Sequence, residues 1–162
     1  MVVILTGVTG SGKTTIGRLL AHELGWAFYD ADAFHSDASV EKMRRGIPLA
    51  DEDRLPWLDS LRALIQAAIA RGENAVLACS ALKAAYRRRL RVNDDVRLVH
   101  LDGDYALIAG RLGRRGEHFM NPSLLQSQFD TLERPTPAEA LIVDAGLPPD
   151  EIVPAIRRGL RL

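Results

Sequence analysis

The most constraining feature of this chain is a glycine-rich segment near its start, Gly7-Val8-Thr9-Gly10-Ser11-Gly12-Lys13-Thr14. It follows an apolar run at residues 2–5 and leads into an amphipathic stretch at residues 15–24. A strand, a glycine-rich turn and a helix in this order form a loop whose backbone N–H groups point inward and bind phosphate oxygens. The positive end of the helix dipole adds to that site. The simpler alternative is a Gly/Ser turn before an ordinary helix, which leaves the complete spacing unexplained.

Two side chains of this segment suit a bound nucleoside triphosphate and its metal ion. Lys13 supplies a compact positive charge to the β- and γ-phosphates, and the Thr14 hydroxyl is a ligand for Mg²⁺. The other predicted nucleotide contacts are Gly7, Val8, Thr9, Gly10, Ser11, Gly12 and Thr15. The segment therefore predicts nucleotide binding and leaves open what happens to the γ-phosphate.

Length, charge and cysteine usage narrow the class of protein. The 162 residues suit a single domain, residues 1–162, and the formal net charge of zero gives no reason to expect nucleic acid or an anionic membrane as partner. No apolar run approaches the roughly 20 residues of a membrane span, and the immediate start of the first strand leaves no room for a signal peptide. The single cysteine, Cys79, fits a reducing cytoplasm. We expect a cytoplasmic protein.

Apolar runs alternate with amphipathic stretches along the chain. Strands are expected at residues 2–5, 27–29, 75–79, 96–101 and 141–143. Helices are expected at 14–24, 82–90, from 105 to 112, at 122–132 and 149–160, and in two pieces within 36–71, with Asp51 as N-cap of the second piece. This alternation predicts an α/β fold with a five-stranded parallel sheet and helices on both faces. Ligands then bind beyond the carboxyl ends of the strands.

Several classes of nucleotide-binding protein do not fit. The Asn-Lys-x-Asp segment of base-specific GTPases is absent from the sequence. The third strand ends in Cys79-Ser80-Ala81, whereas motor and transporter ATPases generally end it in Asp-Glu or Asp-x-x-Gly. Small kinases that move phosphate from ATP to a small acceptor remain. For a member of this class we expect a P-loop kinase fold with a substrate-binding segment, about residues 33–60, and a short lid, about residues 113–123.

Two carboxylates, Asp30 and Asp32, end the second strand. In an extended segment they would share one face. One can make a water-mediated contact to Mg²⁺, and the other can accept the proton of an acceptor hydroxyl. The alternative is a solvated pair at a strand-to-loop turn. We assign Asp32 to catalysis and, with Thr14, to the metal.

The residues that follow resemble the gluconate kinase (gluconokinase) family of small P-loop kinases. The resemblance spans roughly residues 2–145. Its most specific segments are Asp51-x-Asp53-Arg54-x-Pro56-Trp57-Leu58 and Cys79-Ser80-Ala81-Leu82-Lys83-x-x-Tyr86-Arg87. The other matching segments are Asp30-x-Asp32-x-x-His35, Glu41-Lys42-Met43-x-x-Gly46-x-Pro48-Leu49, Arg111-Leu112-x-x-Arg115-x-x-His118-Phe119 and Gln128-Phe129-x-Thr131-Leu132-Glu133-x-Pro135.

The resemblance implies ATP-dependent phosphorylation of D-gluconate at its 6-hydroxyl. Gluconate is a small anion with many hydroxyls, so its recognition needs a cation for the carboxylate and short polar groups for the hydroxyls. The substrate-binding residues expected on this basis are Asp32, His35, Lys42, Arg54, Ser80, Lys83, Arg87 and His118. Which cation meets the carboxylate stays open. So do three other interpretations: His35 as a helix cap, Arg54 paired with Asp51 or Glu52, and Trp57 as core packing.

The resemblance also places two arginines near ATP. Arg111 and Arg115 are four residues apart, which puts them on one face if the helix persists. Arg115 is the predicted catalytic residue that stabilises charge on the transferring phosphoryl group. The alternative is a basic helix end that interacts with its own dipole. Members of the family are commonly homodimeric, so a homodimer is an expectation from the resemblance alone.

Three rival functions come from two classes, two of them enzymatic and one not. A shikimate kinase is the nearest enzyme, but that family has a glycine-rich segment where this chain has Ser80-Ala81-Leu82-Lys83. A nucleoside monophosphate kinase fits less well, because the segment at 35–58 suits a sugar acid better than a nucleotide. The non-enzymatic rival is an ATP-binding regulatory module, against which Lys13, Thr14, Asp32 and Arg115 argue.

Overall fold

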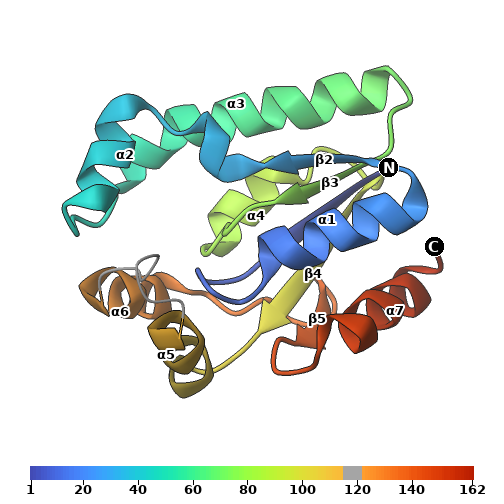
Figure 1. Cartoon of the computed structure of the whole chain (residues 1–162). Coiled ribbons are helices and arrows are strands. Elements are labelled where there is room, and N and C mark those ends of the chain that lie inside the picture. The colour runs from blue at the N-terminus through green and yellow to red at the C-terminus, as the bar shows by residue number, and fades with distance from the viewer. Residues whose placement is uncertain (115–121) are drawn as a thin grey trace.

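A five-stranded parallel sheet forms the centre of the molecule (Figure 1). The structure is a computed structural model that describes residues 1–114 and 122–162. The strands are β1 (Val2–Thr6), β2 (Ala27–Asp30), β3 (Ala75–Ala78), β4 (Val96–Asp102) and β5 (Leu141–Asp144). They lie in the order β2-β3-β1-β4-β5, which confirms the predicted sheet. Each predicted strand is present, with ends within one residue of those expected.

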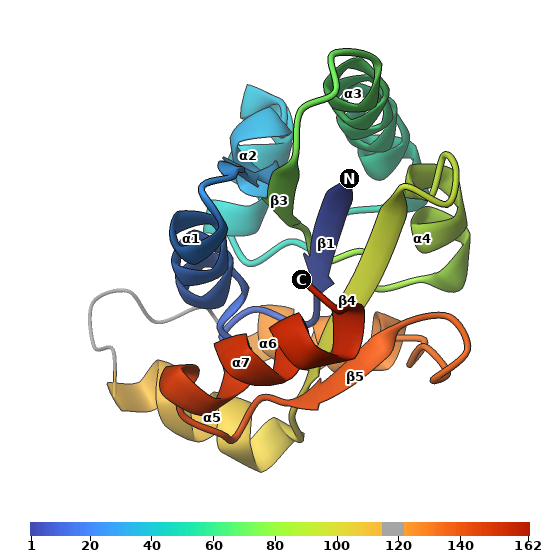
Figure 2. The same cartoon turned by 90° about the vertical axis from the view of Figure 1, so that its right-hand side faces the viewer.

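Helices cover both faces of the sheet. They are α1 (Lys13–Leu24), α2 (Asp37–Arg44), α3 (Asp51–Ala70), α4 (Ala84–Leu90), α5 (Tyr105–Arg114), α6 (Pro122–Thr131) and α7 (Pro149–Leu160), and a 3₁₀ turn, η1 (Ala31–Phe34), follows β2. Helices α1 and α7 lie on one face, and α3 and α4 lie on the other (Figure 2). No helix in the described ranges is long and apolar enough to span a lipid bilayer.

Alternate residues of β1 pack into two separate cores, one on each face of the sheet, as expected for a central strand buried on both faces. Val3 and Leu5 of β1 pack in the core beneath α1 and α7. Val2 and Ile4 pack in the opposite core, which contains Leu61 and other residues of α3. The burial of β1 on both sides fixes the position of the glycine-rich segment that follows it.

The predicted two-piece helix is confirmed, with one correction at its second start. Helix α3 begins at Asp51, so Ala50 occupies the N-cap position and the prediction of Asp51 there was wrong. The Ala50 N–H is instead bonded by Asp53, whose Oδ2 lies 2.9 Å away. A carboxylate in the first turn satisfies a free N–H and interacts favourably with the helix dipole.

Strands that follow β1 in the sequence lie on both sides of it in the sheet, so the winding of the chain changes side at β1. The chain passes from β1 through α1 to the edge strand β2, whereas β4 and β5 lie on the other side of β1. Such a reversal opens a crevice at the carboxyl ends of the strands, where doubly wound sheets bind ligands. The candidate residues therefore gather at one end of the sheet.

Candidate active site

The loop between β1 and α1 forms a glycine-rich cradle. Gly10 and Gly12 have φ of +84° and +102°, which side chains rarely tolerate. A Cβ on Gly7 would lie 2.7 Å from Ser11 Oγ and 2.9 Å from the Leu101 carbonyl oxygen, so the packing leaves room only for glycine. A cavity of about 210 Å³ opens here; its lining is Thr9, Gly10, Gly12, Lys13, Thr14, Thr15, Asp30, Asp32 and Ala78.

Lys13 lies across this cradle. Its Nζ donates a hydrogen bond to the Val8 carbonyl oxygen at 2.9 Å. Burial lowers the pKa of Lys13, and the nearby Asp32 carboxylate is the largest influence that raises it. An ammonium held among few competing ligands is well placed to bind phosphate oxygens.

Asp30 and Asp32 do not lie in one extended segment, because the chain turns into η1 directly after Asp30, but both residues line the cavity of the cradle. Asp30 Oδ1 accepts a hydrogen bond from the Asp32 N–H at 3.0 Å, and Asp30 Oδ2 accepts one from Thr14 Oγ1 at 3.1 Å. The extended arrangement expected from the sequence was therefore wrong. Asp30, which the sequence left without a fixed role, is the carboxylate next to Thr14.

Thr14 and Asp30 together suit a Mg²⁺ ion that is also bound by phosphate and water, and not a metal ion enclosed by protein ligands alone. Mg²⁺ keeps several waters and is usually held by one or two carboxylates together with substrate phosphates. Within the described ranges, no group of three or more His, Cys, Asp or Glu side chains is arranged to hold a metal. A hydroxyl and a carboxylate beside a phosphate cradle, as at Thr14 and Asp30, match the magnesium pattern.

A second cavity, of about 400 Å³, continues from the cradle toward α2, α3 and α6. Thr9, Lys13 and Asp32 line both cavities. The remaining lining residues are His35, Val40, Met43, Pro48, Leu49, Arg54, Trp57, Ser80, Leu82, Leu124, Ser127 and Gln128. The volume lies in the usual range for small-molecule sites. We call this space the acceptor cavity.

His35 and Trp57 form one wall of the acceptor cavity. Their rings stack with centroids 4.4 Å apart and planes 13° apart. Trp57 is fixed by a hydrogen bond from its Nε1 to the Ala31 carbonyl oxygen at 2.8 Å, so it is both a core residue and a cavity wall. Burial lowers the pKa of His35, which favours the neutral ring. His35 Nδ1 is buried without a hydrogen-bond partner among the described residues, so it is available to a ligand hydroxyl.

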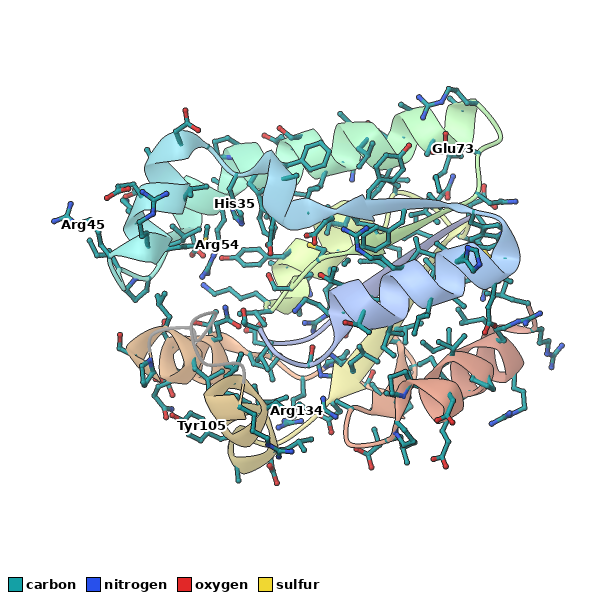
Figure 3. All side chains as sticks on the ribbon, viewed as in Figure 1. His35, Arg45, Arg54, Glu73, Tyr105 and Arg134 are labelled. Atoms are coloured by element: carbon teal, nitrogen blue, oxygen red, sulfur yellow. The ribbon has the colours of Figure 1, made fainter. Side chains whose placement is uncertain are left out.

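Arg54 brings a guanidinium group to the same cavity (Figure 3). Its Nη1 donates a hydrogen bond to the Tyr86 hydroxyl at 3.2 Å, and the guanidinium carbon, Cζ, lies 5.6 Å from the centre of the Tyr86 ring. The Tyr86 hydroxyl in turn donates to Asp51. Arg54 thus has an orienting partner and no described carboxylate partner, which leaves its charge for an anionic ligand.

Three of the predicted substrate-binding cations do not line the acceptor cavity. Lys42 Nζ bonds both carboxylate oxygens of Asp53 at 3.0 Å, and Lys83 Nζ bonds Asp51 Oδ1 at 2.9 Å. Arg87 is 1% exposed and pairs with Glu139. Each of the three is neutralised by a carboxylate of this chain, so the structure gives no support to their assignment as substrate ligands.

A third hollow, of about 240 Å³, lies on the other side of the cradle between α1, α5 and the loop after β5. Arg111 lines it and donates a hydrogen bond to the Ala145 carbonyl oxygen. Leu147, Pro149 and Ile152 supply apolar surface suited to a planar base. Arg115 and His118, the remaining predicted site residues, lie outside the described residues.

Gln128 is a contact that sequence reasoning did not assign. It lies on α6, and its side-chain amide accepts from the Thr9 N–H at 2.7 Å and donates to Thr9 Oγ1 at 3.0 Å. The sequence contained it only as one letter of the Gln128-Phe129 segment, with no hint that it reaches the glycine-rich loop. Asp30 was missed for a different reason, since its direction depends on the turn that follows it.

Comparisons with known proteins agree with this arrangement. The shikimate kinase family model matches residues 9–153. A probable gluconokinase from Rattus norvegicus is 47% identical, covering 99% of this chain and 97% of its own length. The crystal structure of a sugar kinase from Janibacter sp. HTCC2649 has a TM-score of 0.92 at 45% identity, covering 99% of this chain and 94% of the other.

A gluconokinase from Sinorhizobium meliloti 1021 has a TM-score of 0.89 at 39% identity, covering 98% of this chain and 90% of the other. The shikimate kinase model reflects the P-loop kinase fold that these proteins share. The match to gluconokinases is more specific, because at 39–47% identity it covers nearly the whole chain and therefore extends over the segments that line the acceptor cavity. The chain belongs to the gluconokinase family.

Proposed function

We propose that this protein transfers the γ-phosphate of ATP to the 6-hydroxyl of D-gluconate, which gives 6-phospho-D-gluconate and ADP. The observation that carries the proposal is the joining of two cavities at Lys13 and Asp32. One cavity has the form of a phosphate cradle, and the other offers a guanidinium, an imidazole and hydroxyl groups to a small anion. The names of its relatives supply the identity of the acceptor.

On the donor side, the cradle amides and Lys13 bind the phosphates and reduce the repulsion that an incoming hydroxyl oxygen would meet. Thr14 and Asp30 would hold Mg²⁺, which neutralises phosphate charge when bound. Asp32 would contribute through the metal's waters, as an outer ligand. Arg111 lies beside the hollow proposed for adenine. Arg115 is proposed to bind the transferring phosphoryl group.

On the acceptor side, Asp32 is proposed to accept a hydrogen bond from the 6-hydroxyl and then its proton as the new P–O bond forms. Arg54 is the proposed partner of the gluconate carboxylate, because its charge has no described carboxylate partner. His35 and Ser80 are proposed to bond the intervening hydroxyls, and His118 is a further proposed contact. The chemistry then depends mainly on position and electrostatics.

A coupled assay of ADP release tests the proposal. The acceptors compared are D-gluconate, shikimate, other sugar acids and nucleoside monophosphates, each with ATP and Mg²⁺. We expect strong stimulation by gluconate and a 6-phosphorylated product by mass and NMR. Preferential turnover of shikimate would favour the rival kinase. No stimulation by any acceptor would favour an ATP-binding regulatory module.

A further inference from the structure

The loop after β3 touches both halves of the site. Ser80 lines the acceptor cavity, and its carbonyl oxygen accepts a hydrogen bond from the Gly7 N–H of the phosphate cradle at 3.3 Å. The next residue, Ala81, has a φ of +39°, a backbone conformation that residues with side chains seldom adopt. A strained residue of this kind persists only where its surroundings hold it.

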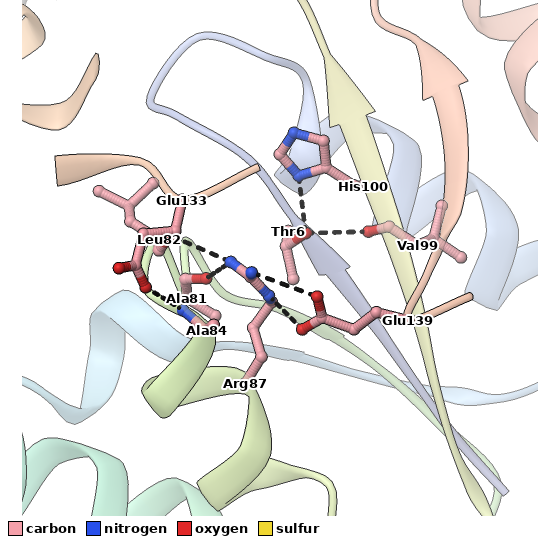
Figure 4. Close-up of polar contacts among 9 residues, drawn as sticks. All are labelled: Thr6, Ala81, Leu82, Ala84, Arg87, Val99, His100, Glu133 and Glu139. Atoms are coloured by element: carbon pink, nitrogen blue, oxygen red, sulfur yellow. Dashed lines mark hydrogen bonds and ion pairs between the residues drawn. The ribbon is translucent and has the colours of Figure 1, made fainter. Parts of the chain in front are cut away.

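Arg87 of α4 holds the loop from within the protein (Figure 4). Its Nη1 donates to the carbonyl oxygens of Ala81 at 3.1 Å and Leu82 at 3.0 Å. Its Nε and Nη2 donate to the two carboxylate oxygens of Glu139 at 2.6 and 3.4 Å. The planar, forked guanidinium can make all these bonds at once, which a lysine ammonium cannot.

The segment after α6 holds the same loop from the other side. The Glu133 N–H donates to the Leu82 carbonyl oxygen at 2.9 Å, and Glu133 Oε1 accepts from the Ala84 N–H at 2.7 Å. Glu139, which pairs with Arg87, belongs to the same segment. Earlier along this stretch, Gln128 bonds Thr9 of the cradle. Residues 128–139 therefore touch both the donor loop and the loop that carries Ser80.

We infer that the Arg87–Glu139 pair positions Ser80 at the acceptor cavity, so that acceptor affinity depends on two residues that do not line it. Arg87 is then a positioning residue and not a ligand of the acceptor. A buried ion pair is by itself weak evidence for stability. Here its extra bonds go to the carbonyls of the strained loop, which points to a role in conformation. The inference rests on the proposed function, since it identifies what sets recognition at that same site.

The test is a double-mutant cycle of Arg87→Lys and Glu139→Gln, with steady-state kinetics for both substrates. We expect each single variant to raise KM for gluconate about tenfold and to leave KM for ATP within about twofold of wild type. Because both substitutions release the same loop, the double variant should be no worse than the poorer single variant. Arg88→Lys, at the exposed neighbouring position, is the matched control and should behave as wild type.

The outcomes separate three roles. Direct contact between Arg87 and the acceptor would raise KM for gluconate in Arg87→Lys, leave it at the wild-type value in Glu139→Gln and give additive effects in the double variant. That result would overturn the inference. A lowered Tm in both variants with unchanged KM values would also overturn it, because the pair would then only stabilise the fold. Glu139→Gln keeps the shape of a partly exposed side chain, so it provides a folded variant even if Arg87→Lys does not.

The wild-type protein in the same assay distinguishes this inference from the proposed function. Absence of gluconate-dependent ADP release in wild type would remove the proposed function, and the same cycle would then be run with whichever acceptor supports turnover. Normal wild-type turnover with unaffected variants would remove only the role of the pair.

Discussion

The side-chain amide of Gln128 forms two hydrogen bonds with Thr9, one with its backbone N–H and one with its hydroxyl. This contact joins α6 to the middle of the phosphate cradle across 119 positions of sequence. Because the cradle binds phosphate through its backbone N–H groups, the orientation of Thr9 affects the donor site. Gln128 also lines the acceptor cavity. It is therefore the described residue of α6 best placed to influence both substrates.

Replacing Gln128 should impair donor binding. Gln128→Ala removes both bonds to Thr9, and we expect kcat/KM for ATP to fall about tenfold, in line with the loss of one or two hydrogen bonds in a preorganised site. Gln128→Glu keeps an acceptor for the Thr9 N–H and should fall less. Gln126→Ala, which removes only an exposed bond to Asp130, is the control. Equal kinetics in Gln128→Ala and the control would contradict this role.

The two carboxylates after β2 should separate by phenotype. Asp32→Asn removes the proposed proton acceptor, so we expect kcat to fall by about 10²-fold or more, with a smaller rise in the Mg²⁺ concentration needed for half activity than Asp30→Asn causes. Asp30→Asn replaces the carboxylate beside Thr14 with a neutral amide and should raise that concentration several-fold. Titration of activity with Mg²⁺ measures both. A normal kcat in Asp32→Asn would remove it from the mechanism.

Arg54 and Lys42 should also differ, although the sequence assigned both to the substrate. Arg54→Met removes the guanidinium that faces the acceptor cavity, and we expect KM for gluconate to rise about 30-fold or more, the cost of losing a charge-assisted pair. Lys42→Met removes the partner of Asp53 on the protein surface and should leave that KM near wild type. Similar increases of KM in both variants would place Lys42 at the substrate.

The fold was predictable because its signals are local. The apolar runs of β1 and β3, the glycine-rich turn and the break before α3 each lie within a few residues of sequence. The predicted helix boundaries were less accurate where capping decides them. Helix α3 begins after Ala50, because Asp53 accepts a hydrogen bond from the Ala50 N–H from within the helix. Nothing in the spacing of Asp51 and Asp53 distinguishes these two arrangements.

The site was only partly predictable, because the partner of a charged side chain is set by distant segments. His35, Arg54 and Ser80 line the acceptor cavity, and their contact with the substrate stays a prediction. Lys83 meets Asp51 over 32 positions, and Arg87 meets Glu139 over 52. A sequence shows that a cationic side chain is present but not which carboxylate pairs with it in the folded chain. The same limit hid Gln128, whose partner Thr9 lies near the other end of the chain.

Acid should destabilise the protein through His100, which lies on β4 under the cradle. The ring is 2% exposed, and its Nδ1 lies 3.0 Å from Thr6 Oγ1. Burial, reinforced by the charge of Arg87, lowers the pKa of His100 to about 4. Asp102 lies 3.6 Å from Nε2, but Arg134 pairs with the same carboxylate. The folded state therefore resists protonation of this ring.

In the unfolded chain a histidine has a pKa near 6.5. Below that pH the unfolded chain binds a proton at His100, whereas the folded protein does not bind it until about pH 4. The free energy of unfolding therefore falls as pH drops from about 6.5 to about 4, by on the order of 3 kcal/mol in all. Above about pH 7 it contributes no pH dependence. Urea unfolding of wild type and His100→Gln across this range measures the difference, with the exposed His22→Gln as control. If the pH slopes of wild type and His100→Gln coincide, His100 does not carry the acid sensitivity.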